Sequence, residues 1–358
     1  MIQLEGDYLE GGGQLVRTAL ALSTITGKGF EVSNIRHGRK VPGLKAQHIH
    51  CIEALKKLCG AEVEGLELGS ENLRFVPGKI EPKTVSVDIG TAGSVSLLLQ
   101  PLLLPGILAG GKVRFKIKGG TSGKWAMPFD FFNEVFVPQL RRYADIDCKL
   151  VRRGYYPKGG GQIDIKIKGR YTFDALEDPV VRQGVPQIDI IEQGKIMQIK
   201  GISHASADLE KAQVAERQAS AAKHMLSKLN VPVNIMAQYS DTFSTGSGIT
   251  LWAVFSKDAD DVDVNNPIRL GADALGEQGK RAEIVGEEAA RTLLQEIESD
   301  APVDFRLADN LVPFIAVFGG RFRTSKITDH TKTGIYVVEQ FLGKCIDVDE
   351  NNRIIERK

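Results

Sequence analysis

The sequence predicts a mixed α/β (α+β) fold, in which a large domain of repeated α/β units is interrupted by a smaller inserted α/β domain. A stretch with the order glycine-rich turn, apolar helix and strand occurs three times along the 358 residues. Between about residues 183 and 276 the pattern changes to strands and one long helix. The chain is 42% hydrophobic and 25% charged, which is ordinary for a globular protein with a real core. Its length suits two domains.

The three recurring stretches predict several copies of one α/β unit that share a core. The first reads "EGGGQLVRTALALSTITGKGFEVSNI", and the second, about 80 residues later, reads "IGTAGSVSLLLQPLLLPGILAGGKVRFKI". The third, "LADNLVPFIAVFGGRFRTSKI", lacks the leading glycines. In each copy we expect the apolar run to form a helix and the residues after the next glycine turn to form a strand.

The segment after Gln183 predicts a self-contained α/β layer. Two strands are expected on either side of a Gln-Gly turn, followed by a long helix capped by Ser206 or Asp208 and by two more strands. An inserted domain is the natural interpretation of this change. We therefore predict an inserted domain at 184–276 and a large domain made of 1–183 and 277–358.

The composition excludes a membrane protein. The most apolar stretch is broken by Gln100, Pro101 and Pro105, so it predicts a buried helix and no membrane span. The first residues show no basic segment followed by an apolar block, so we expect no secretion signal. Four cysteines without CxxC spacing indicate reduced thiols in a cytoplasmic protein. Cys51 and Cys59 are eight apart on an expected helix, which predicts two core positions.

Binding to nucleic acid would need local basic patches, because the net charge is only +1. One patch contains Arg36, Arg39, Lys40 and Lys45 without an acidic residue. Another contains Lys149, Arg152, Arg153 and Lys158 around Tyr155 and Tyr156. A charge run is more often a solvated surface, so each patch alone says little.

The glycine run at Glu10–Gln14 precedes a helix and could let backbone amides approach an anion. A tight turn at a helix start explains it equally well. Glu10 is unusual there, because a carboxylate beside an anion site generally means that a metal ion lies between them. Arg17, one turn into the helix, could reach the same anion or could extend out of the core to solvent.

Two further segments have a functional and a structural interpretation. Arg36 and Arg39 stand in a loop before a helix expected to start near Pro42, and arginine grips phosphate at two points. His48 and His50 are two apart on that helix and should not share a metal. The aromatic residues that follow Gly119 and Gly120 could stack a base or could form core.

His330 stands at the start of an expected apolar helix, whose Ile335, Val338 and Phe341 share one face. Ser325, Thr328 and Asp329 are typical of turn and cap positions. Backbone N–H groups at a helix N-terminus attract anions. On this stretch alone, a surface histidine is the simpler interpretation. Together with the glycine turns and the arginine loops, it predicts a polyanion site and phosphate chemistry.

Six segments resemble the RNA 3′-terminal phosphate cyclase family, in the family's order and over nearly the whole chain: "EGGGQLVRTALALSTITG", "IRHGRKVPGLKAQH", "GTAGSVSLLLQ", "YYPKGGG", "LADNLV" and "HTKTGIYVVEQFLG". The resemblance implies a large domain of repeated α/β units, like the C-terminal domain of a bacterial translation initiation factor and like the enolpyruvyl transferases. It also implies a smaller inserted α/β domain.

The resemblance also implies roles for individual residues. It places the family's nucleophilic histidine at His330 and a metal-contacting residue at Glu10. It places the nucleotide and phosphate contacts at Arg17, Arg36, Arg39, His48, Gln100, Pro128, Phe131, Asp309 and Asn310, with the adenine against Phe131 and Pro128. Asn310 departs from the family's usual Gln, and Arg306 stands where an aromatic residue is usual. These departures concern the details of nucleotide contact.

The resemblance implies a ligase-type, nucleotidyl-transferring enzyme. It would convert an RNA 3′-terminal phosphate to a 2′,3′-cyclic phosphate through a covalent histidine–AMP and an RNA-adenylate, releasing pyrophosphate and AMP. The expected cofactors are ATP and Mg²⁺ (or Mn²⁺), and the expected partner is RNA with a 3′-phosphate; a homo-oligomer is left open. The alternative is a non-catalytic cyclase-like factor in ribosomal RNA processing, but such relatives lack the histidine. An enolpyruvyl transferase shares the repeated fold but not these segments.

Overall fold

The structure is a computed structural model that describes residues 1–9, 12–124, 126–257 and 263–358. Four sheets of four strands each make up the described part of the fold, and helices cover them. Three of these sheets, with their helices, follow one chain order: strand, helix, strand, helix, strand, strand. The predicted α/β class and the predicted repetition of one unit are therefore confirmed.

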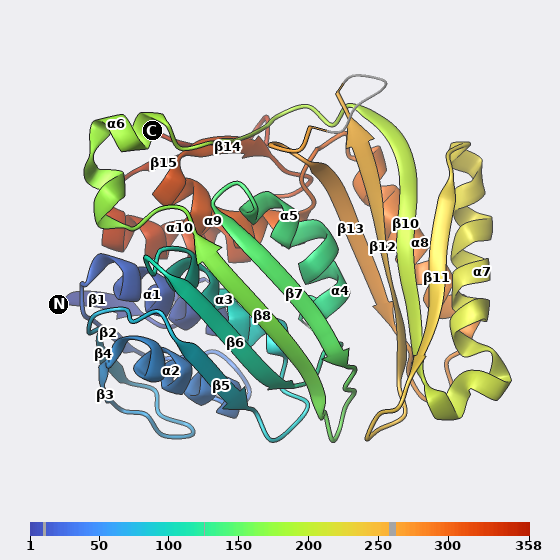
Figure 1. Ribbon diagram of the computed structural model, residues 1–358, viewed down its shortest axis with the longest axis horizontal. Helices are drawn as coiled ribbons and strands as arrows, with labels where there is room; N and C mark the ends of the chain where they lie inside the picture. The colour runs from blue at the N-terminus through green and yellow to red at the C-terminus, as the bar shows by residue number, and fades with distance from the viewer. Residues whose placement is uncertain (10–11, 125, 258–262) are drawn as a thin grey trace.

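The first unit occupies the N-terminal part of the chain, at the left of Figure 1. It consists of β1 (Ile2–Glu5), α1 (Gly13–Thr26), β2 (Phe30–Ser33), α2 (Ala46–Cys59), β3 (Glu62–Glu64) and β4 (Leu73–Val76). Cys51 and Cys59 are buried in α2, as predicted. The helix α2 starts at Ala46, four residues later than expected, because the backbone from Asn34 to Lys45 forms turns.

The second unit follows the same order with a divided second helix. It consists of β5 (Thr84–Asp88), α3 (Val95–Ile107), β6 (Lys112–Gly119), α4 (Phe129–Phe131), a π-helical turn (Phe132–Phe136), α5 (Val137–Leu140), β7 (Ala144–Arg152) and β8 (Gly161–Gly169). The helix α3 is apolar on nearly all sides and is buried, as the sequence predicted. Ser94 caps it by accepting a hydrogen bond from the backbone N–H of Leu97.

The third unit is divided in sequence. It consists of β9 (Ile188–Ile190), α9 (Phe305–Phe318), β14 (Gly320–Arg323), α10 (Asp329–Leu342), β15 (Ile346–Asp349) and β16 (Ile354–Arg357). Its strand order, β9-β14-β16-β15, corresponds to β1-β2-β4-β3 and β5-β6-β8-β7. In each unit the first two of these strands pair in parallel and the other two pairs are antiparallel.

The fourth sheet lies at the right of Figure 1 and comes between β9 and α9 in sequence. It consists of β10 (Lys195–Ser206), β11 (Val233–Ser240), β12 (Ser247–Ser256) and β13 (Ile268–Leu275), with α7 (Val214–Leu226) and α8 (Ala282–Glu298) packed against it. These elements begin and end later than the predicted range 184–276, because β9 pairs with β14 and α8 packs on β12 and β13. The division of the chain into domains stays a prediction.

The predicted long helix of this segment is interrupted, and both predicted caps are wrong. A 3₁₀ helix (Ala207–Ala212) comes first, and Gln213, at a φ of 49°, precedes α7. The Ser206 hydroxyl accepts from the backbone N–H of Gly246 at 3.1 Å, and the Asp208 carboxylate accepts from the Thr245 hydroxyl. Both side chains are therefore used by the neighbouring loop and cap no helix.

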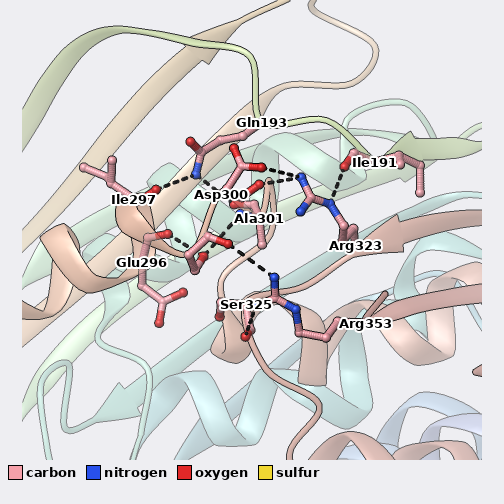
Figure 2. A network of polar contacts seen from close by, with 10 residues as sticks. Ile191, Gln193, Glu296, Ile297, Asp300, Ala301, Arg323, Ser325 and Arg353 are labelled. Carbon is pink, nitrogen blue, oxygen red and sulfur yellow. Dashed lines mark hydrogen bonds and ion pairs between the residues drawn. The ribbon is translucent and has the colours of Figure 1, made fainter. Parts of the chain in front are cut away.

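The chain passes twice between the fourth sheet and the third unit. Residues of both connecting segments take part in one polar network (Figure 2). The Gln193 side-chain amide donates to the carbonyls of Ile297, at 3.2 Å, and Ala301, at 3.0 Å. Arg323 of β14 donates to the carbonyl of Ile191 at 2.8 Å. Arg353 donates to the carbonyl of Ser325 at 2.9 Å. The two connections between the fourth sheet and the third unit therefore lie side by side.

The same junction contains two buried carboxyl groups, Glu296 and Asp304. Both Asp304 oxygens accept backbone N–H groups, from Leu307 at 2.8 Å and Gly271 at 3.0 Å. Burial and the neighbouring Glu296 raise the pKa of Asp304 to about 7, and burial raises the pKa of Glu296 as well. The Glu296 Oε2 atom has no hydrogen-bond partner in the described part of the chain. We infer that burial makes this pair of carboxyl groups retain a proton in the folded chain.

We expect Glu296→Gln to stabilise the protein at alkaline pH. A raised pKa in the fold means that the folded chain keeps a proton that the unfolded chain releases, so stability falls as pH rises above the ordinary titration range of a glutamate. The variant does not lose stability in this way, so its free energy of unfolding at pH 8 should exceed that of the wild type by roughly 1–3 kcal/mol. Urea unfolding at pH 5.5 and pH 8 measures the difference. Glu298→Gln, at an exposed position of the same helix, should change neither value, and an equal pH slope in both variants would contradict the inference.

The fourth sheet is joined to the second unit by buried polar side chains. Arg153 donates to Asp130 at 2.7 and 3.1 Å and to Gln238 of β11 at 3.0 Å. The Tyr155 hydroxyl lies 2.7 Å from His204 Nδ1, and burial followed by Arg153 lowers the pKa of that imidazole well below its usual value. Arg153, one of the four basic residues in the predicted patch around Tyr155, is therefore structural. No helix in the described ranges is long and apolar enough to span a bilayer.

Candidate active site

Four helices from all three units bring one group of polar side chains together. The helix α1 of the first unit packs against α3 of the second and against α10 of the third, and α10 also packs against α9. Polar residues on these four helices lie among otherwise apolar contacts: Gln14, Arg17, Gln100, Asp309, Asn310 and His330. Five of these six were predicted site residues, and Gln14 belongs to the glycine segment that the sequence singled out. We call this group the junction cluster.

Gly13 begins α1 and leaves room for two side chains of the site. A Cβ atom at Gly13 would lie 2.1 Å from His48 Nε2 and 2.8 Å from the Arg17 guanidinium. The His48 ring is fixed because its Nδ1 accepts the backbone N–H of Lys45 at 3.0 Å. Burial, followed by Arg17 and Arg36, lowers the pKa of His48 to about 3. His48 is therefore neutral at physiological pH and presents an Nε2–H donor next to Arg17.

A chain of hydrogen bonds links Arg17 across the cluster. The Arg17 Nε–H donates to the Gln100 side-chain oxygen at 2.6 Å, and the Gln100 amide donates to the Asn310 side-chain oxygen at 2.8 Å. The Asn310 amide in turn donates to the carbonyl of Arg306 at 2.7 Å. Each of the three units therefore contributes one side chain to this chain of hydrogen bonds, and each side chain orients its neighbour.

Arg17 is a buried cation with a neutral partner. Its side chain is only 8% exposed, and in the described ranges no carboxylate forms an ion pair with it. Burial, with a contribution from Arg36, lowers the pKa of Arg17 to about 10. A buried charge is costly unless an opposite charge or several hydrogen bonds accompany it. The position is therefore suited to an anion that binds beside Arg17.

The start of α10 is held by hydroxyl groups. Thr328 is the N-cap residue, and its hydroxyl accepts from the backbone N–H of Thr331. The hydroxyls of Thr328 and Thr331 both donate to Asp309 Oδ1, each at 2.6 Å. The predicted cap at Thr328 is confirmed, and Asp309 connects α9 to this cap. Nothing in the sequence predicted that the two threonine hydroxyls would donate to Asp309.

His330 lies in the first turn of α10, one residue further into the helix than the loop position that the sequence indicated. Its side chain is half-buried. The Gln14 side-chain amide donates to the His330 carbonyl at 3.1 Å, which ties the histidine backbone to α1. A histidine held rigidly at a helix N-terminus lies where backbone N–H groups favour an anion.

A small cavity of about 30 Å³ lies inside the cluster. It is lined by polar groups from Gln14, Arg17, Gln100, Asp309 and Asn310 and by the apolar residues Phe136, Pro313 and Phe314. The predicted adenine-packing residues lie elsewhere. Phe131 is fully buried against Gly271 of β13, and Pro128 is the residue before α4. The aromatic rings beside the polar cluster are thus Phe136 and Phe314, which the sequence did not separate from other core phenylalanines.

The remaining predicted residues lie in the loop before α2 or outside the described ranges. Arg36, at a φ of 59°, is half-buried and donates to the carbonyl of Val41 at 3.3 Å. Burial and the neighbouring Arg39 lower the pKa of Arg36, and Arg39 itself is exposed. Arg36 therefore contributes positive charge close to His48, and Arg39 adds positive charge close to Arg36. Glu10, the predicted metal contact, lies outside the described residues, and the described ranges contain no group of three or more His, Cys, Asp or Glu that could hold a metal.

Comparison with known proteins shows the family of the chain. A family model described as "RNA 3'-terminal phosphate cyclase" matches residues 8–348. The chain belongs to this family. An RNA 3'-terminal phosphate cyclase of Pyrococcus abyssi is 45% identical over 350 residues, 98% of this chain and 95% of the relative. Proteins of the same name from Archaeoglobus fulgidus and Saccharolobus islandicus are 41% and 40% identical over 99% and 97% of this chain, and over 100% and 96% of their own lengths.

Two departures from the family's expected pattern have visible contacts. Asn310, in place of Gln, still bridges Gln100 and the carbonyl of Arg306. Arg306, in place of an aromatic residue, forms an ion pair with Asp273 of β13. In this member of the cyclase family, Arg306 therefore connects α9 to the fourth sheet.

We expect Gly13→Ala to impair the site without unfolding the protein. The new Cβ would displace the fixed His48 ring and the Arg17 guanidinium, and a shift of about 1 Å can cost about a hundredfold in rate. Alanine is a better helix residue than glycine, so thermal stability should be retained. The measurement is the rate of covalent labelling by radioactive ATP. Gly334→Ala in α10 is the matched control, because the atoms nearest to its added Cβ would lie at an ordinary 3.7 Å. Equal labelling rates in both variants would refute the packing argument.

Proposed function

We propose that the protein converts RNA 3′-terminal phosphates to 2′,3′-cyclic phosphates, using ATP and forming a covalent AMP adduct on His330. Membership of the cyclase family supports the reaction. The junction cluster supports the use of phosphate, because buried Arg17, which has no carboxylate ion pair in the described ranges, belongs to the same group of side chains as His330 in the first turn of α10. The burial of the Arg17 charge, without a carboxylate ion pair among the described residues, is the observation on which the proposal most depends.

The proposed first step is attack by the neutral imidazole of His330 on the α-phosphorus of ATP. A nitrogen–phosphorus bond forms, the bond to the bridging oxygen breaks, and pyrophosphate leaves. Arg17, Arg36 and Arg39 would neutralise the negative charge that develops on the leaving group. His48, which is neutral, would donate a hydrogen bond from Nε2 to a phosphate oxygen without adding another charge.

In the proposed second and third steps the AMP group moves and is then released. An oxygen of the RNA 3′-phosphate attacks the adenylyl phosphorus, the bond to imidazole breaks, and an RNA-adenylate forms. The neighbouring 2′-hydroxyl then attacks the 3′-phosphorus, loses its proton, and displaces AMP. Because nucleophile and phosphorus belong to one nucleotide, ring closure needs no further reactant.

A divalent metal, Mg²⁺ or Mn²⁺, is part of the proposal. It would screen the phosphate charges during the reaction. Asp309 is the carboxylate of the described cluster, but its Oδ1 atom already accepts two hydroxyl hydrogens. We therefore propose that Glu10, at the family's metal-contacting position, supplies the principal protein oxygen.

An end-protection assay tests the reaction. RNA ending in a 3′-phosphate should become resistant to phosphatase on incubation with the protein, ATP and Mg²⁺, whereas RNA with a 3′-hydroxyl should not react. Formation of the cyclic end without nucleotide would contradict the ATP-dependent route. A non-catalytic role in ribosomal RNA processing is the competing proposal, and a complete absence of both labelling and cyclisation would favour it.

A further inference from the structure

We propose that the outer face of the second unit's sheet is a docking surface for the RNA strand upstream of the reacting 3′ end. The strands of this sheet, β5, β6, β8 and β7, lie in front of α3 in Figure 1. Along β6 and β8 the side chains alternate between buried apolar residues and polar residues that are exposed or partly exposed. The exposed residues therefore form one continuous solvent-facing surface, which we call the basic face.

The basic face has an excess of positive charge. It presents seven basic side chains, Lys112, Arg114, Lys116, Lys118, Lys149, Lys166 and Lys168, and four acidic ones, Asp88, Asp145, Asp147 and Asp164. Three of the acidic side chains form ion pairs with three of the basic ones: Arg114 with Asp164, Lys118 with Asp88, and Lys166 with Asp147. The fourth, Asp145, pairs with Arg170. In the described ranges, Lys112, Lys116, Lys149 and Lys168 have no ion-pair partner.

Strand register places like charges directly opposite one another on this face. Lys112 of β6 lies opposite Lys168 of β8, and Arg114 lies opposite Lys166. Like charges directly opposite in an antiparallel pair destabilise a sheet. Because Asp164 and Asp147 already pair with Arg114 and Lys166, the repulsion that a bound anion could relieve lies between Lys112 and Lys168.

The other two units serve as internal comparisons, because they share the topology but not the charge. The outer face of β1-β2-β4-β3 presents Glu5, Glu31, Glu62 and Glu64 against Arg74. The outer face of β15-β16-β14-β9 presents Asp189, Asp347, Asp349 and Glu356 against Arg321 and Arg323. The architecture therefore does not require a basic outer face, which is confined to the second unit.

Exposed aromatic rings at one end of the basic face favour RNA over other polyanions. The loop that joins β7 to β8 presents Tyr156, which is 80% exposed. Nearby, the Arg152 guanidinium lies 4.3 Å from the centre of the Phe243 ring, which is 55% exposed. Cations that track phosphates, combined with rings on which bases can stack, are the usual means of binding single strands. A purely electrostatic partner would have no use for the rings.

The basic face and the junction cluster lie on opposite sides of the sheet and α3. Gly106 of α3 packs on Phe115 and Ile167 of the sheet, while Gln100 faces Arg17 of α1. The intervening sheet and helix are roughly 20 Å thick. A strand engaged at both places must pass round the sheet, and a trinucleotide, with about 3.4 Å of rise per stacked nucleotide, is too short. The docking surface should therefore act only on longer substrates.

The test compares a triple variant, Lys112→Gln/Lys116→Gln/Lys168→Gln, with a matched control, Lys200→Gln/Lys211→Gln/Lys223→Gln, on the fourth sheet and its helices. Binding is measured by fluorescence anisotropy with a 20-nucleotide RNA ending in a 3′-hydroxyl, which needs no catalysis. The first variant should bind about 10- to 100-fold more weakly at 0.1 M salt. Its salt slope, the slope of the log binding constant against log salt concentration, should be smaller in magnitude by about 2. The control variant should match the wild type. Tyr156→Ala should weaken binding without changing the salt slope.

Cyclisation kinetics provide the second measurement, and this part depends on the proposed function. The triple variant should show a raised KM for a 20-nucleotide 3′-phosphate RNA, an unchanged KM for a trinucleotide, and unchanged labelling by ATP. Equal RNA binding by the two variants would overturn the docking surface even if cyclisation proceeds normally. A binding difference in a protein that shows no labelling would support the surface and refute the proposed reaction.

Discussion

Replacing His330 with alanine is expected to abolish the covalent AMP adduct and to lower cyclisation by at least about a thousandfold. His330 is half-buried in the first turn of α10, and its removal takes away the proposed nucleophile while leaving the Thr328 cap and the Asp309 contacts intact. The protein should therefore remain folded. Incubation with α-labelled ATP, followed by denaturing electrophoresis, measures the adduct directly.

The chemistry of the adduct identifies the atom that bears it. A phosphorus–nitrogen bond to imidazole should survive alkali and hydroxylamine and should hydrolyse in acid, whereas an acyl phosphate on a carboxylate should be cleaved by hydroxylamine. Asp329→Ala, one residue earlier in the same turn, is the matched control and should retain the label. Because lysine would give a similarly acid-labile bond, the labelled peptide has to be mapped. Label on a lysine, or wild-type labelling of the His330 variant, would refute the assignment.

Arg17→Ala is expected to lower adenylylation by roughly a hundredfold to a thousandfold while leaving thermal stability unchanged or slightly higher. The variant removes a buried cation whose hydrogen-bond partner is the neutral Gln100, so the folded protein loses little when the charge is gone. Arg17→Lys should restore little activity, because lysine lacks the planar guanidinium that can contact Gln100 and a phosphate together. Labelling rates and melting temperatures together measure the two effects.

Arg142→Ala provides the opposite result and serves as the control. Arg142 is also buried, but it donates to the carbonyls of Gln139 and Gln187 and to the side chain of Asn266. Its removal should lower the melting temperature and leave labelling by the folded fraction unchanged. Full activity of Arg17→Lys would mean that charge alone matters at this position.

Local patterns in the sequence were sufficient to predict those features that depend on a single helix and its neighbouring residues. The recurring turn, helix and strand correctly predicted the three units, and Thr328 was correctly expected to cap the helix of His330. Arg17, Gln100 and Asn310 were assigned through family segments, and the structure brings them into one chain of hydrogen bonds. What each of them can bind stays a prediction.

Features that depend on distant partners could not be read from the sequence. The strand β9 is only three residues long and exists because β14, about 130 residues later, supplies its hydrogen bonds. The break at Gln213 reflects contacts of Ser206 and Asp208 with the loop around Gly246. Phe131 is indistinguishable in sequence from Phe136, and only the fold shows which of them lies beside the polar cavity.

The pairing of β9 with β14 also governs how the protein is completed on the ribosome. The sheets of the first two units and the fourth sheet can each form as soon as their own segments emerge, since their strands are close in sequence. The third sheet has to wait until β14 is synthesised, and α10, which contains His330, emerges later still. A nascent chain that stops before residue 329 would therefore have the arginines and the fourth sheet in place but would lack His330. The covalent adduct proposed on His330 would then require that α10 has been synthesised.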